Sequence, residues 1–139
     1  GTQENFVSMM NDKAAELHCS NTHFTNPSGL FDEDHYTTAR DMAVIAREAM
    51  KDPTFRKIVA TKDHKAQRTD SDYLTFHNKN KTIFQYDGGT GIKIGYTKAS
   101  GRTLVASAER DGRSMICVVM SAPDWFQDAY KLMDYGFDR

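Results

Sequence analysis

The sequence lacks a long apolar run, a cysteine framework and an excess of charge of either sign. No apolar run approaches the roughly 20 residues that a membrane-spanning helix needs. The 18 Lys and Arg nearly cancel the 19 Asp and Glu, which leaves a net charge of −1 and argues against a general nucleic-acid-binding surface. The two cysteines, Cys19 and Cys117, set no disulfide framework and have no Cys-x-x-Cys partner. We read Cys117, inside an apolar strand, as a small core residue and Cys19 as a free thiol.

What is present is an ordinary globular composition. The 139 residues are 39% hydrophobic and 27% charged, which suits one domain or one large piece of a domain. The sequence starts at Gly1 without a signal-peptide pattern, so we expect any targeting segment to lie upstream or to be absent.

Four stretches have helical signals. Apolar residues recur at helical spacing from about Glu4 to Leu17. A second helix is expected after Thr38, read as its N-cap with Asp41 as the capping acid, and a short third helix after Asp52-Pro53. A terminal helix is expected with an apolar face and a closing glycine, made by Trp125, Ala129, Leu132, Met133 and Gly136.

The second half of the sequence changes to a strand period. Alternation predicts strands over residues 91–96, 103–108 and 114–120, and Asp111-Gly112 between the last two is typical of a hairpin turn. Residues 62–81 are polar and read either as a loop or as a ragged hairpin. The order of elements predicts an α+β fold: a helical lobe, then an antiparallel sheet with a helix on one face.

Several familiar sites are disfavoured. No two of the five histidines show the His-x-x-x-His spacing of a helical metal site, and we interpret them as surface or hydrogen-bonded residues. The glycines of 88–91 lead into a strand rather than a helix, so they do not make a phosphate loop. We read Asn26-Pro27-Ser28-Gly29-Leu30 as a structural turn.

The stretch Gly91-Ile92-Lys93-Ile94-Gly95-Tyr96-Thr97 is the strongest candidate for chemistry. A glycine within a strand leaves the backbone open to a ligand, and a lysine beside that gap can hold an anion or take part in proton transfer. The backbone N–H of Tyr96 can donate to a developing oxyanion. The residues alone leave open a plainer alternative, in which Lys93 protects an edge strand from aggregation.

This stretch and five others resemble the D-alanyl-D-alanine carboxypeptidases, which are low-molecular-mass penicillin-binding proteins of the serine β-lactamase-like superfamily. The matching stretches, in an order and spacing that fit nearly the whole chain, are residues 6–14, 22–30, 35–43, 91–97, 99–105 and 132–137. The family has three motifs: Ser-x-x-Lys, Ser-x-Asn and Lys-Thr-Gly. No serine here has the spacing of the first two, so the resemblance covers the C-terminal half of the catalytic domain and implies that the nucleophile and its base lie outside this chain.

The third motif is present but altered, since Lys93 and Gly95 match while Ile94 stands in place of Thr. The resemblance implies that Lys93 assists proton transfer around the nucleophile and attracts the substrate carboxylate, and that Tyr96 supplies an oxyanion N–H. Ile94, Gly95 and Thr97 are the implied substrate-binding positions. Ile94 has no hydrogen-bond donor, which predicts weak or redirected carboxypeptidase activity. Arg102 is a candidate to replace part of the lost carboxylate contact, with a surface arginine as the alternative.

The resemblance therefore implies a β-lactamase/transpeptidase-like, partial α+β domain. We expect residues 1–62 to form mainly the helical lobe, 63–90 to be irregular, 91–122 to form the strands and 123–139 the closing helix. The implied reaction is hydrolysis of the terminal D-alanine of peptidoglycan peptides through an acyl-serine intermediate, in the bacterial cell envelope and without metal or cofactor. The expected partners are stem peptides, β-lactams and the N-terminal half of the same domain, with self-association or swapping of the chain alone. The alternative is a non-catalytic module that binds wall peptides.

Overall fold

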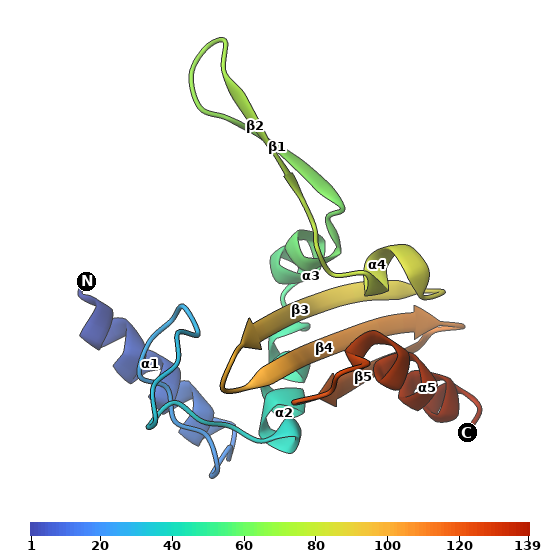
Figure 1. The fold of residues 1–139 in the computed structure, drawn as a ribbon, viewed down its shortest axis with the longest axis horizontal. Helices are drawn as coiled ribbons and strands as arrows, with labels where there is room; N and C mark the ends of the chain where they lie inside the picture. The colour runs from blue at the N-terminus through green and yellow to red at the C-terminus, as the bar shows by residue number, and fades with distance from the viewer.

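The computed structural model describes all residues, 1–139, and shows helices packed on both faces of a three-stranded antiparallel sheet (Figure 1). The strands are β3 (Gly89–Thr97), β4 (Gly101–Arg110) and β5 (Arg113–Val119), in the order β3-β4-β5. The α-helices are α1 (Gln3–Glu16), α2 (Ala39–Ala49), α3 (Pro53–Ala60), the short α4 (Thr82–Gln85) and α5 (Trp125–Phe137). The expected α+β architecture is confirmed.

The helices begin where side chains can accept the free N–H groups of a first turn. Thr2 and Thr38 accept from Asn5 N and Asp41 N, and Asp52 accepts from the first turn of α3. The expectation that Asp41 caps α2 is wrong. Its buried carboxylate instead accepts the N–H of Asn21 at 2.9 Å and the hydroxyl of Thr22 at 2.8 Å. Asp41 therefore fastens the loop before α2 to that helix.

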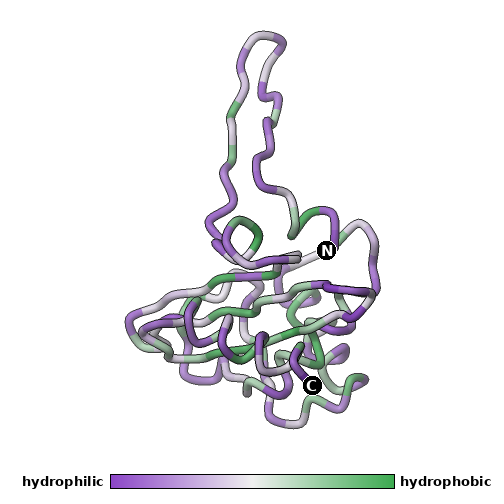
Figure 2. The backbone as a smooth tube through the Cα atoms, turned by 90° about the vertical axis from the view of Figure 1, so that its right-hand side faces the viewer, coloured by the Kyte–Doolittle hydropathy of each residue, from purple (hydrophilic) through white to green (hydrophobic).

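The strand predictions hold, and the sheet is somewhat longer than expected. The turn between β4 and β5 is made by Asp111 and Gly112, with φ of 51° and 73°, which suits the tight hairpin that Asp-Gly predicts. Residues 63–90 are not irregular, since they contain α4 and an antiparallel hairpin of β1 (Asp63–Gln67) and β2 (Tyr73–His77). This hairpin extends away from the body of the molecule and is largely hydrophilic (Figure 2). The second of the two alternatives for this region is the correct one.

The main apolar core lies between the sheet and α5. It contains Leu104, Ala106 and Ala108 of β4 with Phe126, Ala129 and Met133 of α5, and Cys117 packs against it half-buried. Burial raises the pKa of the Cys117 thiol to about 11, as expected of a core cysteine that carries no charge. Cys19 is a free thiol in the structure, as expected, and it is buried.

A polar cluster holds the end of α5 to the sheet. Tyr86 donates a hydrogen bond of 2.7 Å to Asp134, and burial together with this bond raises the pKa of Tyr86 to about 12. The expectation that Gly136 closes the terminal helix is wrong, because α5 continues to Phe137. Arg113 of β5 donates to the carbonyls of Gly136 and Phe137, so the last turn has partners without a glycine terminator. A Cβ on Gly136 would lie 2.7 Å from Met115 Cε, so the glycine permits close packing here.

A second apolar cluster lies on the other face of the sheet, beneath α2 and α3. It contains Ala46, Ile92 and Val105, with Met42 and Val59 packed against it. None of the helices has the length and apolar character to span a bilayer.

The terminal helix offers a direct test of this packing, because adjacent residues differ in burial. Leu132, expected on the buried face, is 52% exposed, whereas Met133 is 0% exposed. We expect Met133→Ala to lower the free energy of unfolding by about 2–5 kcal/mol, since it leaves a cavity in the core. Leu132→Ala is the matched control and should change it by less than about 0.5 kcal/mol. Urea unfolding measures both, and equal losses would contradict the assignment of the buried face.

Candidate active site

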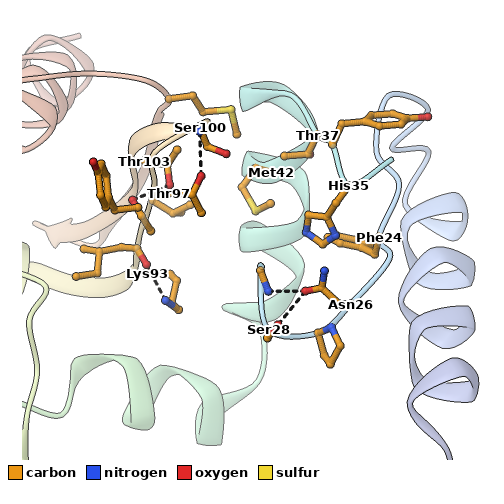
Figure 3. Close-up of a pocket in the computed structure, with 18 of the residues that line it drawn as sticks. Phe24, Asn26, Ser28, His35, Thr37, Met42, Lys93, Thr97, Ser100 and Thr103 are labelled. Carbon is orange, nitrogen blue, oxygen red and sulfur yellow. Dashed lines mark hydrogen bonds between the residues drawn. The ribbon is translucent and has the colours of Figure 1, made fainter. Parts of the chain in front are cut away.

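A groove of about 820 Å³ separates β3 from the loop that joins α1 and α2 (Figure 3). Lys93, Ile94, Gly95, Tyr96 and Thr97 line one wall. The other wall is formed by the loop and α2, through Phe24, Asn26, Pro27, Ser28, Gly29, His35, Tyr36, Thr37 and Met42. The groove combines an apolar lining with convergent polar groups, as a ligand site does.

The β3 wall is an open sheet edge. β3 pairs with β4 on one side only, so its other side presents unpaired backbone groups to the groove. Lys93 pairs with Val105 and Ile94 with Leu104, so their side chains leave the strand on opposite faces. Lys93 is exposed, and its ammonium donates to the carbonyl of Ile94 at 2.6 Å. Figure 3 shows Lys93 on the β3 wall, across the groove from Ser28.

Ile94 packs, half-buried, against the core cluster under α5 while it also lines the groove. From the sequence, Ile94 is expected only at a substrate-binding position, whereas the structure places it in the core as well. The register explains the difference, because the partner of Ile94 is the fully buried Leu104.

Gly95 leaves a gap that a side chain of β4 enters. The hydroxyl of Thr103 donates to Gly95 O at 3.1 Å, and a Cβ on Gly95 would lie 2.7 Å from that hydroxyl oxygen. Thr97, two residues further on, accepts from Ser100 N at 2.9 Å and so closes the turn after β3. The Thr103 hydroxyl therefore occupies the space that a side chain at position 95 would need.

Tyr96 and Arg102, both predicted site residues, differ in whether they line the groove. Tyr96 lines the groove and is 69% exposed. Arg102 does not line it, and its guanidinium donates to the carbonyl of Pro123 at 2.8 Å. This exposed position agrees with the surface-arginine alternative.

Residues 26–29 line the groove directly, whereas the sequence predicts only a structural role for the turn over residues 26–30. The Asn26 side chain accepts from Gly29 N at 2.8 Å and from Leu30 N at 3.1 Å, and it donates to Leu30 O at 3.0 Å. These bonds are the signature of a self-supporting turn, which is why the stretch reads as structural. Nothing in the sequence shows that the folded loop lies opposite β3.

Two further pairs of hydrogen bonds hold this wall. Asn11 of α1 donates to Phe24 O and accepts from Phe24 N, both at 2.8 Å. Asp41 of α2 binds the loop at Asn21 and Thr22. The wall is therefore anchored to both helices that flank the loop.

Comparison with known proteins decides the family. Residues 1–124 match the model of the D-alanyl-D-alanine carboxypeptidase family, Peptidase S11. The chain belongs to this family. The D-alanyl-D-alanine carboxypeptidase DacF of Bacillus subtilis is 37% identical over 100% of the chain and 36% of its own length. DacB2 of Mycobacterium tuberculosis is 35% identical over 99% of the chain and 50% of its own length.

Solved structures agree with the fold. The Streptomyces K15 DD-transpeptidase matches with a TM-score of 0.92 at 35% identity, covering 98% of this chain and 55% of that one. The D-alanyl-D-alanine carboxypeptidase of Mycobacterium tuberculosis matches with a TM-score of 0.91 at 35% identity, covering 100% and 55%. The chain thus has the expected penicillin-binding, transpeptidase-like fold and spans about half or less of the length of these relatives.

The contact at Gly95 makes a prediction about the β3 wall. Gly95→Ala forces the new methyl group against the Thr103 hydroxyl, and we expect it to lower the free energy of unfolding by about 1–3 kcal/mol. In a Thr103→Ala background the oxygen is gone, so the same substitution should cost much less. Urea unfolding of the two single variants and the double variant measures the coupling. Strictly additive losses would contradict a direct contact.

Proposed function

We propose that this chain is the C-terminal half of the catalytic domain of a serine-type D-Ala-D-Ala carboxypeptidase. The complete protein removes the terminal D-alanine from peptidoglycan stem peptides through an acyl-serine intermediate, with no metal or cofactor. The nucleophile and its base come from the N-terminal half of the same domain. The observation that carries the proposal is the position of Lys93, on an open sheet edge that faces a groove and beside a glycine.

The chemistry assigned to each residue follows from this geometry and from the family. Lys93 assists proton transfer around the serine and attracts the substrate carboxylate. The N–H of Tyr96 donates to the oxyanion that forms when the serine attacks. Gly95 lies at the peptide through its backbone, with the Thr103 hydroxyl in the space that a side chain would take, while Ile94 and Thr97 border the carboxylate. Arg102 reaches that carboxylate only if it leaves the carbonyl of Pro123.

The division of the domain is part of the proposal. Residues 1–62 contribute to the helical lobe, 63–90 connect it to the sheet, 91–122 form strands and 123–139 the closing helix. The proposed location is the bacterial cell envelope, where stem peptides and β-lactams are met.

The open edge of β5 supports a missing half. β5 carries Met115, Ile116, Cys117 and Val118 in succession, and α2 and α5 pack on its two faces. A strand that is apolar on both faces is typical of the inside of a sheet. We propose that the N-terminal half pairs with this edge, and that the chain alone self-associates or swaps through it.

A fluorescent penicillin tests the reaction class. The complete protein should become covalently labelled, because β-lactams acylate a working serine of this family, whereas the 139-residue chain alone should not. Gel fluorescence after denaturation measures the label. Reversible binding without a covalent label would instead support the alternative, a wall-peptide-binding module, which Ile94 favours. A labelled 139-residue chain would refute the placement of the nucleophile outside it.

Ile94 gives a second prediction for the complete protein. Ile94→Thr restores a hydroxyl at the proposed carboxylate site, and a hydrogen bond to a charged group contributes about 1.5–3 kcal/mol. We expect kcat/KM for an acylated D-Ala-D-Ala peptide to rise by about tenfold or more. Ile94→Val is the matched control, because it has the shape of Thr without the hydroxyl, and should give no rise. An unchanged or lower value for Ile94→Thr would show that position 94 does not contact the carboxylate.

A further inference from the structure

His35, interpreted from the sequence as a surface or hydrogen-bonded histidine, occupies the wall of the groove that faces β3. It lies in the loop before α2, is half-buried, and lines the groove with Phe24 and Met42. Its ring packs edge-on against Phe24, with centroids 5.7 Å apart and planes at 64°. Figure 3 shows the imidazole between Phe24 and Met42, on the side of the groove opposite Lys93.

A backbone contact decides which ring nitrogen carries the proton. The N–H of Thr25 points at Nδ1 of His35 at 3.1 Å. A backbone N–H can only donate, so Nδ1 is the acceptor and the neutral ring carries its proton on Nε2. The Thr25 hydroxyl also lies at Nδ1, at 3.3 Å. Nδ1 is therefore occupied by the loop, and Nε2–H makes no hydrogen bond within the protein.

His23, in the same loop, shows the opposite arrangement. Its Nδ1 lies 2.6 Å from the carbonyl oxygen of Asp34, which can only accept. The neutral ring of His23 therefore carries its proton on Nδ1. His23 does not line the groove. Of these two loop histidines only His35 lines the groove, and its neutral ring carries the proton on Nε2.

A peptide bound along β3 would need such a donor on the far wall. An extended chain that lies beside an edge strand directs alternate peptide groups toward that strand and the others away from it. Carbonyls that point away from β3 face the wall of Phe24, His35 and Met42. Phe24 and Met42 present no side-chain donor, whereas the Nε2–H of His35, which has no partner within the protein, can hold such a carbonyl.

We propose that the Nε2–H of His35 donates a hydrogen bond to a backbone carbonyl of the bound stem peptide and so positions the peptide against β3. This rests on the proposed function, since it names a contact of the same groove. His35 takes no part in proton transfer to or from the serine. It is a substrate-positioning residue, so its removal affects binding more than turnover.

The test uses the complete protein with an acylated D-Ala-D-Ala peptide. His35→Leu should raise KM about three- to tenfold, the effect of one lost neutral hydrogen bond, with kcat changed less than about twofold. His35→Gln, whose amide donates from near the position of Nε2, should recover most of the loss. His64→Leu, on the exposed strand β1 of the outlying hairpin, is the control and should leave both constants unchanged.

A readout independent of activity is the nitrogen NMR spectrum of the imidazoles. Nε2 should be protonated in His35 and Nδ1 in His23, and a protonated Nδ1 in neutral His35 would overturn the proposal. An unchanged KM in His35→Leu would overturn it too, as would a loss that His35→Gln does not recover, since that indicates a purely structural role. If the unsubstituted protein neither acquires a penicillin label nor releases D-alanine, the proposed function itself fails. A labelled, active protein with unaffected His35 variants refutes only the role of His35.

Discussion

The unpaired edge of β3 is the constraint on which the site depends. A strand inside a sheet uses its peptide groups on both sides, and only an edge strand can offer them to a ligand. In this chain β4 occupies one side of β3, and the groove occupies the other. Position 95 of this edge strand requires glycine, because a Cβ there would collide with the Thr103 hydroxyl of the neighbouring strand. An open edge also invites aggregation, and the exposed ammonium of Lys93 opposes that whether or not it has the role proposed for it in the groove. The two interpretations of Lys93 from the sequence are thus compatible.

The opposite wall is a loop, and its position depends on buried polar contacts rather than on regular structure. Asp41 is 5% exposed and accepts from two donors of the loop, so removing its carboxylate would leave the N–H of Asn21 without its partner. Asn11 fixes the same loop to α1 by a reciprocal pair of hydrogen bonds. These residues do not line the groove as Ser28 and His35 do, yet they determine where that wall lies. Precise placement of a binding loop requires this kind of support from its surroundings.

The sequence predicted what depends on local spacing. Thr38, Asp52-Pro53 and Asp111-Gly112 act through neighbours one to three residues away, and these caps and turns are present as expected. It failed where a distant residue decides the outcome. Gly136 does not end α5 because Arg113, on another strand, binds the last carbonyls. In the site, the Lys93–Thr97 wall was recognisable as one continuous motif. The wall that contains Asn26 and His35 was not, because only the folded chain brings that loop to face β3.

Ile94 shows how the sheet limits the choice of residue at a functional position. Its side chain leaves β3 on the face of α5 and packs beside Leu104, while part of it remains in the groove. A residue here contributes to the core and to the site at the same time. Compared with threonine, isoleucine stabilises the core, because burying its extra methyl and methylene groups is worth about 1 kcal/mol or more. It lacks, however, the hydroxyl that could donate to a carboxylate. Lys93 projects from the other face and is free of that compromise. The lysine at 93 and the isoleucine at 94 are therefore independent features of the motif, and the absence of a hydroxyl at 94 leaves the charge at 93, with the role proposed for it, in place.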